Sequence, residues 1–246
     1  MAIDIQEKRI DGVDLREHGK DAHGKTIHSD QRLYMQLLVF TGLSDIQRSL
    51  FYGELQKEGI SGALYASLHD PNGIGLLTTS EDPQFFVTQL IDFLQDSPFR
   101  GLKCRPEWTM VGRTYSIGYE QDLNETLIER PRRYVCNPEW PWAIWYPVRR
   151  SGDFESLSAE ERRKILMEHG GIGLAYGRSD HAHDIRLACH GLDQNDNDFV
   201  IGILGKKLHP LSALIERMRK TQQTSRYLTN LGPFFVGHVL WQTQLP

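Results

Sequence analysis

The chain has 246 residues, of which 39% are hydrophobic and 10% aromatic, and its formal net charge is −4 at pH 7. This composition favours a folded protein of one large or two small domains and excludes a largely disordered chain. The slightly acidic balance excludes the basic face that nucleic acid requires, so no nucleic-acid partner is expected. The charged N-terminus and the lack of a long apolar run predict no signal peptide and no membrane association. Three cysteines without zinc or redox spacing favour a reducing, cytoplasmic setting.

Residues 1–30 predict a flexible N-terminal arm, because they mix charges and glycine with little apolar periodicity. Three histidines lie in this stretch: His18, His23 and His28. Histidine-rich tracts bind metal in some proteins, but the irregular spacing here favours solvated side chains over ligands.

Residues 31–120 predict a first half with the order β-α-β-β-α-β. The apolar, β-prone run 33–40 is typical of a strand, and a helix capped by Ser44 follows it. A turn at Asp70-Pro71-Asn72-Gly73 predicts a hairpin. The expected elements are strand 33–40, a helix from Ser44 to Gly59, strands 62–68 and 74–79, a helix after Pro83, and strand 108–116.

Residues 121–139 are polar and contain two prolines, which predicts a linker, and residues 140–246 then repeat the same order. In this second half, Ser158 and Glu161 form a capping box at the start of a helix that is expected to end near His169 in a Gly-rich turn. The other expected elements are strands 142–148, 183–190, 199–204 and 234–241, and a helix over 211–220. The pattern indicates an α+β fold of two ferredoxin-like repeats, packed sheet to sheet with the helices outside.

Two clusters of metal-ligand residues are better explained without a metal. On a strand, His181 and His183 share one face while Asp184 points to the other, so the three do not converge. The acidic run Asp193, Asp196 and Asp198 lacks the glycine and glutamate of an EF-hand and suits a hairpin turn.

Several motifs of the second half, taken together, resemble the chlorite dismutase superfamily, which includes the coprohaem decarboxylases of bacterial haem synthesis. They are Tyr146-Pro147-Val148-Arg149-Arg150, Ser158-Ala159-Glu160-Glu161-Arg162-Arg163, Met167-Glu168-His169-Gly170, Gly191-Leu192-Asp193 and Gly232-Pro233-Phe234-Phe235-Val236-Gly237. The resemblance implies a dimeric α/β barrel of two ferredoxin-like repeats. It also implies haem b or iron coprohaem in the C-terminal half, and a homo-oligomeric ring, commonly a pentamer.

His169 falls on the family's proximal iron ligand. By itself it resembles a satisfied core histidine, but the resemblance makes it the expected ligand of haem iron. That role needs a neutral imidazole with its second nitrogen held by an acceptor, for which Glu168 or a carboxylate from elsewhere is a candidate.

Tyr146 falls where coprohaem decarboxylases carry a tyrosine that forms a radical and starts the oxidation of a propionate. The alternative is a tyrosine on a half-buried strand that only needs a partner. Arg149 or Arg150 is the nearby cation that the resemblance requires. The residues that follow keep the shorter spacing of chlorite dismutases but lack their pair of tryptophans, having Phe154 and Glu155 instead.

The distal position of the family falls on Asp184, where chlorite dismutases carry arginine and decarboxylases often carry glutamine. Arg186 is expected on the same strand face and is the alternative cation, because residues two apart on a strand point the same way. An aspartate would repel chlorite and suits acid–base chemistry.

The expected function is therefore haem-dependent oxidation with peroxide, of the coprohaem decarboxylase type. The alternatives are chlorite dismutase activity, which releases chloride and dioxygen, and a haem carrier or sensor without catalysis. The expected catalytic residues are Tyr146, Arg149, Asp184 and Arg186. Around the haem, His169 is the expected ligand, Arg150 and Met218 are expected contacts, and the basic cluster of Arg217, Arg219, Lys220 and Arg226 offers contacts to the propionates.

Overall fold

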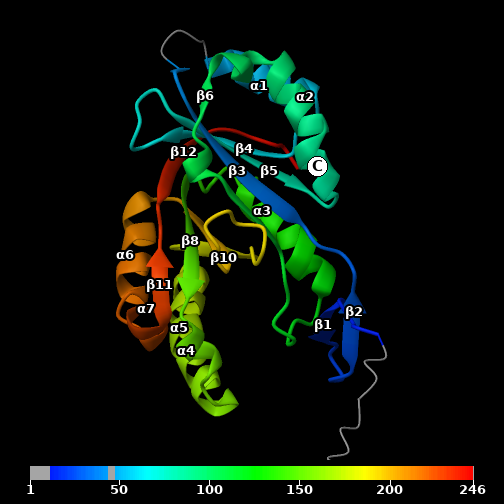
Figure 1. The fold of residues 1–246 in the computed structure, drawn as a ribbon, viewed down its shortest axis with the longest axis vertical. Helices are drawn as coiled ribbons and strands as arrows, with labels where there is room; N and C mark the ends of the chain where they lie inside the picture. The colour runs from blue at the N-terminus through cyan, green and yellow to red at the C-terminus, as the bar shows by residue number, and fades with distance from the viewer. Residues whose placement is uncertain (1–11, 44–47, 246) are drawn as a thin grey trace, which may run out of the picture.

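The computed structural model describes residues 12–43 and 48–245, and within them the chain folds into two similar halves (Figure 1). The first half contains β3 (Tyr34–Thr41), α1 (Arg48–Lys57), β4 (Gly62–Ser67), β5 (Ile74–Ser80), η2 (Pro83–Val87), α2 (Gln89–Asp96), η3 (Pro98–Gly101), β6 (Lys103–Cys104), η4 (Pro106–Trp108) and β7 (Met110–Arg113). The second contains β8 (Trp142–Arg150), α4 (Gly152–Glu155), α5 (Ala159–Arg178), β9 (His183–Ala188), β10 (Phe199–Gly205), α6 (Leu208–Met218), α7 (Gln222–Tyr227), β11 (Leu228–Leu231) and β12 (Phe235–Gln242). The predicted β-α-β-β-α-β order is present in both halves, while the helix cap predicted at Ser44 lies outside the described residues.

The strands form a closed antiparallel barrel. Their order is β8–β10–β9–β7–β3–β5–β4–β12, and β12 pairs again with β8. Within each half, the first strand of the repeat lies between the third and the fourth, which is the ferredoxin-like arrangement. The two halves join at β4–β12 and at the Arg113–Ala188 pair of β7 and β9. The expected α/β barrel with helices outside is therefore confirmed.

Two glycines permit the close approach of strands at these junctions. A Cβ on Gly112 of β7 would lie 2.7 Å from Cβ of Leu187 on β9, and a Cβ on Gly237 of β12 would lie 2.7 Å from Cβ of Tyr65 on β4. The Val-Gly pair shared by the two closing strands, 111–112 and 236–237, therefore has a packing reason.

Because side chains alternate along each strand, the core has one part inside the barrel and two parts between the barrel and its helices. Inward side chains such as Met35, Leu37 and Trp145 fill the barrel. Outward side chains of the first half pack under α1 and α2 in one cluster. Those of the second half, including Ile144, Tyr146 and Ile203, pack with α5 and α6 in another. Figure 1 shows the two helix layers on different sides of the barrel. No helix in the described ranges combines the length and the apolarity that crossing a bilayer requires.

The N-terminal segment contains a hairpin where the sequence predicted a flexible arm. β1 (Glu17–Lys20) pairs with β2 (Thr26–Ser29), while residues 1–11 lie outside the described residues. The hairpin orders because Glu17 accepts hydrogen bonds from Arg32 Nε at 3.1 Å, Arg113 Nη1 at 3.2 Å and the Ser116 backbone N–H at 2.8 Å. These partners are distant in sequence, so a local pattern does not reveal them.

Helical structure also replaces much of the linker predicted over 121–139. The π-helix η5 (Glu125–Glu129) leads into α3 (Arg130–Val135). Leu127, Ile128 and Val135 are buried in the barrel core. Pro131 follows the π-helical turn directly and lacks the N–H that would continue the helical hydrogen bonds there.

The helix α5 does not end at His169 as predicted but continues to Arg178, through Gly170, Gly171, Gly173 and Gly177. Each glycine disfavours the helix by only about 1 kcal/mol relative to alanine. Ile172 and Tyr176 pack against the outer core of the second half, and this burial outweighs the glycine penalty. The predicted capping box of Ser158 and Glu161 is confirmed at the helix start.

Candidate functional site

The outer face of β8, β10 and β9 gathers the residues that the sequence singled out. Ile201 on β10 pairs with Tyr146 on β8 and with Arg186 on β9, so these three form one row across the sheet. Ile203 pairs with Ile144 and with Asp184 in the next row. Because side chains alternate along a strand, Tyr146, Arg186 and Asp184 all lie on the face that α5 and α6 partly cover.

His169 lies on α5, and Thr221 holds its ring in one tautomer. Nδ1 of His169 is 3.1 Å from Oγ1 of Thr221, and this hydroxyl donates to the Met218 carbonyl at 2.8 Å. A hydroxyl has one proton, so Oγ1 accepts from the His169 Nδ1–H, and the lone pair of the ring is on Nε2. Burial, together with the positive charge of Arg186, lowers the pKa of His169. The ring is therefore neutral near neutral pH, as an iron ligand must be.

The acceptor of this histidine is a hydroxyl and not the expected carboxylate. Glu168 instead accepts from the Gln222 backbone N–H at 3.1 Å. The sequence did not point to Thr221, because the helix α7 was not predicted. Thr221 caps the first turn of that helix. Its place beside His169 depends on how α7 packs against α5.

Tyr146 is 6% exposed, and its ring centroid lies 4.7 Å from that of Phe234. Burial raises the pKa of the phenol, the negative charge of Asp184 adds to the rise, and Arg219 opposes it. The phenol therefore keeps its proton at neutral pH. No hydrogen bond of its hydroxyl is found among the described residues, so removing the hydroxyl leaves no polar partner unpaired.

Asp184 and Arg186 point to the same side of β9, as strand alternation predicts. Arg186 Nε lies 3.1 Å from Asp184 Oδ2, and both side chains are about half exposed. With Tyr115 and Arg130 they line a cavity of about 40 Å³, which is room for little more than a water molecule. Tyr115 belongs to the segment after β7, so the first half contributes one wall of the site.

Arg150 is the cation of β8 that reaches the same face. Its guanidinium lies between the rings of Phe154 and Phe199, 4.7 Å from each centroid. Burial lowers its pKa, and its Nε is buried without a hydrogen-bond partner, as is Oγ of Ser151. Buried unpaired donors are uncommon in folded proteins. A carboxylate group of a porphyrin would supply an acceptor for the Arg150 guanidinium.

Arg149 does not join this group. It points away from Tyr146 and its Nη2 lies 2.5 Å from Asp196 Oδ2. It lines a separate polar cavity with Asn195, Asn197 and Asn230. Strand alternation explains the separation, since neighbouring residues face opposite sides of a sheet.

Met218 and Arg219 lie at the end of α6. A Cβ on Gly173 of α5 would lie 3.5 Å from Cε of Met218, so this side chain bridges the two helices. The Arg219 guanidinium lies 6.0 Å from the ring centroid of Phe234. Arg219 is therefore the member of the predicted basic cluster that approaches Tyr146.

The two other groups of metal-ligand residues in the sequence, 181–184 and 193–198, do not bring their side chains together around one point. His183 stacks on Trp140 with ring centroids 3.7 Å apart, and it bonds to Asp180 at 2.9 Å. His181 lies before β9, and Asp184 points to the other side of that strand. In the predicted turn, Asp193 accepts from the backbone of Asn195 and the side chain of Asn197, so its carboxylate stabilises the loop itself.

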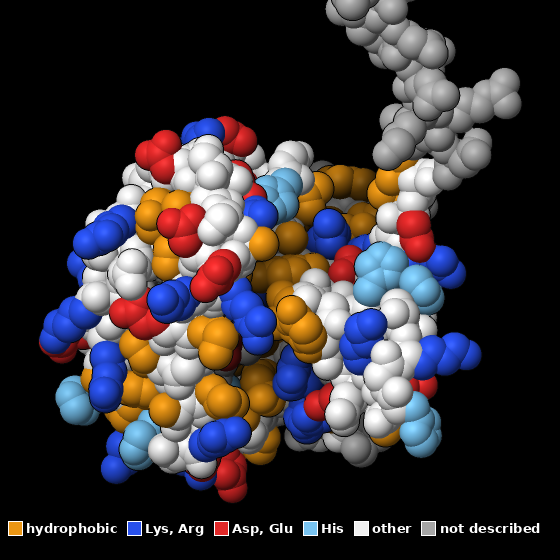
Figure 2. Space-filling view, turned by 90° about the horizontal axis from the view of Figure 1, so that it is seen from below, with side chains coloured by type: hydrophobic (Ala, Val, Ile, Leu, Met, Phe, Trp, Pro, Cys, Tyr) orange, Lys and Arg blue, Asp and Glu red, His pale blue; other side chains and the backbone are white. Residues whose placement is uncertain are grey.

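The end of the molecule that carries α5, the helix of His169, has features that suit an iron porphyrin. A Cβ on Gly170 or Gly171 would meet no atom within 4 Å, so the backbone beside the histidine is open. Figure 2 shows a hollow between two raised parts of the molecule, with hydrophobic side chains on its floor and Lys and Arg along its sides. At this end of the molecule α4 and α5 lie on one side and the β1–β2 hairpin on the other (Figure 1). An apolar hollow with cationic margins suits a flat macrocycle that carries carboxylates.

Comparison with known proteins identifies the family of the chain. The family model for chlorite dismutase matches residues 74–240. Coproheme decarboxylase from Staphylococcus carnosus is 29% identical over 126 residues, which cover 49% of this chain and 48% of the relative. The match thus spans about half the length of that curated relative.

Two solved structures share the fold over most of the chain. A heme-binding protein from Thermus thermophilus has a TM-score of 0.65 and 19% identity, covering 85% of this chain and 91% of that one. A variant of chlorite dismutase from Candidatus Nitrospira defluvii has a TM-score of 0.66 and 17% identity, covering 84% and 90%. The family model and the shared barrel together lead to one conclusion: the chain belongs to the chlorite dismutase family.

Proposed function

We propose that this chain is a haem-dependent oxidoreductase that binds haem b or iron coprohaem on the outer face of its C-terminal half. His169 Nε2 is the proposed iron ligand, and the supporting observation is the contact of its Nδ1 with Thr221 Oγ1, a hydroxyl that also contacts the Met218 carbonyl. The similarity to a coproheme decarboxylase and to a heme-binding protein supports the same cofactor class.

The proposed reaction is peroxide-dependent oxidation of the coprohaem decarboxylase type. The observation that carries it is Tyr146, a buried phenol that lies on the same face as the residues around His169. When bound, haem supplies the redox-active iron at which peroxide is reduced. A propionate loses carbon dioxide, one proton and two electrons and becomes a vinyl group. Peroxide takes up the two electrons, this proton and a second proton from solvent to give two water molecules.

In this proposal Tyr146 passes electrons and Asp184 handles the proton. Because its pKa is raised by burial, the phenol keeps its proton until it also loses an electron. Asp184 is near enough to affect that pKa and pairs with Arg186, and a carboxylate in this place is the proposed proton acceptor. The same Arg186 offers a cation to an incoming anion.

Arg150 is the proposed partner of a propionate, because its Nε and the neighbouring Ser151 Oγ are buried without partners. Arg219 is a second candidate, since it lies beside Phe234 and influences Tyr146. Met218 lies between α6 and α5 and is the proposed apolar contact of the macrocycle. The position of Arg149, paired with Asp196, favours Arg150 for the role that the sequence left open between the two.

The first test of this proposal is cofactor binding. His169→Ala should lose the Soret spectrum of ligated haem after loading, whereas His181→Ala, which changes an exposed histidine beyond the end of α5, should keep it. The cofactor assignment is wrong if the unaltered protein takes up neither haem b nor iron coprohaem.

The second test is catalysis. Protein loaded with iron coprohaem is titrated with peroxide, and the porphyrin is extracted and weighed by mass spectrometry. Loss of carbon dioxide is expected for the unaltered protein and for Tyr115→Phe, a partly buried tyrosine of the opposite wall, but not for Tyr146→Phe. Porphyrin of unchanged mass from every variant would rule out the decarboxylase reaction and leave haem binding intact.

Chlorite conversion to chloride and dioxygen is the second candidate, and Arg186 is the observation that favours it. Paired with Asp184, it makes the distal face neutral where Asp184 alone would repel chlorite. Dioxygen release on adding chlorite to the loaded protein, measured with an oxygen electrode, distinguishes this reaction. Haem uptake with neither reaction leaves a haem carrier or sensor.

The proposal includes a cytoplasmic homo-oligomer, with a pentamer favoured by the family resemblance. The apolar side chains Leu166, Met167 and Leu174 of α5 are exposed in the single chain, and exposed apolar groups of this size are often covered by a partner. Light scattering coupled to size-exclusion chromatography measures the number of chains.

A further inference from the structure

The β1–β2 hairpin brings two histidines face to face. His18 on β1 is the register partner of His28 on β2, and opposite residues of an antiparallel pair have their side chains on one face. Their ring centroids lie 4.8 Å apart, and the rings are inclined at 81°. The two Nδ1 atoms are 2.8 Å apart.

This approach allows only a few protonation states. Two imidazolium rings would both point an N–H into the gap, so at least one Nδ1 carries a lone pair there. When both protons lie on Nε2, the two lone pairs converge on one point. Zinc–nitrogen bonds of about 2.0–2.1 Å at a tetrahedral angle separate two ligand atoms by roughly 3.3 Å. The pair therefore needs to open by only about 0.5 Å to hold an ion.

Asp14 supplies a third ligand atom. Its Oδ2 lies 3.9 Å from His28 Nδ1, and the ligand atoms of Asp14, His18 and His28 all lie within 4.8 Å of one another. Arg16 donates to both Asp14 oxygens, at 2.9 Å each. A carboxylate has about four lone-pair positions, so Arg16 orients Asp14 and leaves room for a cation.

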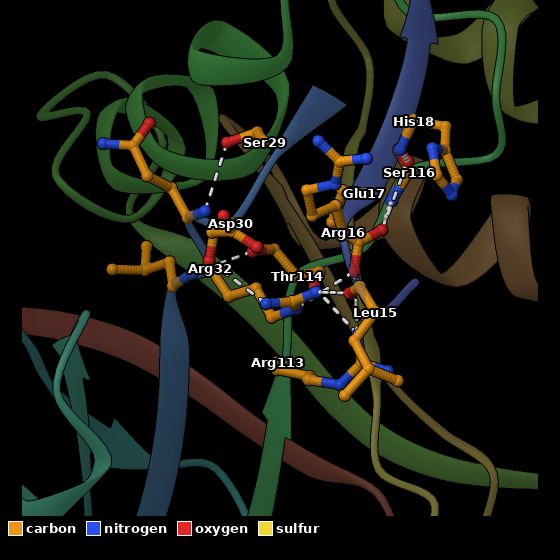
Figure 3. Close-up of polar contacts among 12 residues, drawn as sticks. Leu15, Arg16, Glu17, His18, Ser29, Asp30, Arg32, Arg113, Thr114 and Ser116 are labelled. Carbon is orange, nitrogen blue, oxygen red and sulfur yellow. Dashed lines mark hydrogen bonds and ion pairs between the residues drawn. The ribbon is translucent and has the colours of Figure 1, made fainter. Parts of the chain in front are cut away.

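The strand that carries His18 is held to the rest of the chain by contacts of Glu17 and of the His18 backbone (Figure 3). Glu17, whose side chain is 11% exposed, ties β1 to Arg32, Arg113 and Ser116. The His18 backbone N–H also donates to Ser116 Oγ at 3.0 Å. Ligands on a supported strand pair lose less conformational entropy on binding than ligands on a free terminus.

We propose that Asp14, His18 and His28 form a second metal site, separate from the haem site, that binds a divalent transition-metal ion such as Zn²⁺. Two imidazoles and one carboxylate suit zinc, and three protein ligands leave a fourth position for water. The positive charge of Arg16 opposes the bound ion, which indicates weaker binding than in a closed zinc site. The ion would join β1 to β2 and stabilise the hairpin.

The test is a calorimetric titration with Zn²⁺ of full-length protein carrying His169→Ala, which removes the imidazole of the haem site. One ion per chain is expected. His18→Ala and His28→Ala should each weaken binding at least about tenfold, since even groups that only support ligands contribute that much. Asp14→Asn should weaken it less. His23→Ala, a histidine of the same hairpin outside the cluster, is the matched control and should bind as before.

Co²⁺ gives a second measurement that does not depend on a variant folding correctly. Co²⁺ is added to the parent protein, which is the full-length chain with His169→Ala alone. Its visible absorption should show low-coordinate nitrogen and oxygen ligation, and added Zn²⁺ should abolish this absorption. Circular dichroism in the presence of a chelator checks that each variant is folded. The site is disproved if the parent binds no Zn²⁺, if folded His18→Ala and His28→Ala bind as tightly as His23→Ala, or if Co²⁺ remains fully hydrated. The contact would then be a hydrogen bond between two imidazoles.

Discussion

Arg186 Nε lies 3.1 Å from Asp184 Oδ2, so β9 presents an ion pair to the candidate site and not a lone carboxylate or a lone cation. The substitution Asp184→Asn keeps the shape of the side chain and removes its negative charge. The freed Arg186 should bind anions better, by up to about fivefold, because a half-exposed ion pair is worth at most about 1 kcal/mol. Azide titration of the haem-loaded protein, followed by absorption, measures the change.

The matched variant for this prediction is Arg186→Gln, which should weaken azide binding. If neither substitution changes the azide affinity, the pair does not face the distal side of the bound haem.

Thr221 should set the affinity for haem through His169. Thr221→Val removes the acceptor of the Nδ1–H, so the ring can turn or change tautomer, and haem should bind about tenfold more weakly. The same change removes a helix cap, worth about 1 kcal/mol of stability. Thr221→Ser keeps both the cap and the acceptor and should restore binding. Haem transfer to apomyoglobin compares the variants, and equal transfer rates would contradict the role.

The junction glycines should be intolerant of side chains. Gly237→Ala would place a Cβ 2.7 Å from the Cβ of Tyr65 and 3.2 Å from the Ala66 carbonyl oxygen. Since backbone and core atoms must then move apart, the free energy of unfolding should fall by about 1–3 kcal/mol. Urea unfolding measures this loss. Unchanged stability would mean that β12 and β4 are less closely packed than the structure shows.

Gly170→Ala should have the opposite effect. Its Cβ would meet no atom within 4 Å, and Gly170 lies inside α5, where alanine is favoured over glycine by about 1 kcal/mol. The apo-protein should therefore gain roughly 0.5–1 kcal/mol in urea unfolding. A loss of stability would indicate that the helix ends before this residue, as the sequence alone predicted.

The three cysteines should differ in their reactivity toward thiol reagents. Cys104 is exposed, whereas Cys136 and Cys189 are buried. Burial raises the pKa of Cys136 to about 11 and that of Cys189 to about 12. The thiolate is the reactive form, so at about pH 8 these two stay protonated and inert.

Ellman's reagent should accordingly label one thiol in the native protein and three in guanidinium. Native labelling that is unchanged in Cys104→Ser would contradict this assignment. Because a raised pKa delays ionisation, the two buried thiols should remain unreactive as the pH rises toward about 10.

The repeated order of strands and helices was readable from local sequence. Alternating and helical apolar patterns depend on neighbouring residues, and both halves carry them. The closure of the barrel depends on contacts between segments far apart in the chain, such as β4 with β12. The hairpin 17–29 and the helix 130–135 were mispredicted for the same reason, since Glu17 and Val135 gain their stabilising partners only in the folded chain.

In the candidate site, too, some features were readable from the sequence and others depend on contacts between distant segments. The sequence by itself selected the residues that we propose carry the chemistry: His169 on a helix, Tyr146 on a strand, and Asp184 with Arg186 two positions apart. Only the tertiary structure decided that Thr221 holds the imidazole, that Arg150 and not Arg149 reaches the site, and that His18 faces His28. The sequence specifies the type of each side chain. The partner, tautomer and protonation of that side chain depend on which distant groups the fold brings within hydrogen-bond distance.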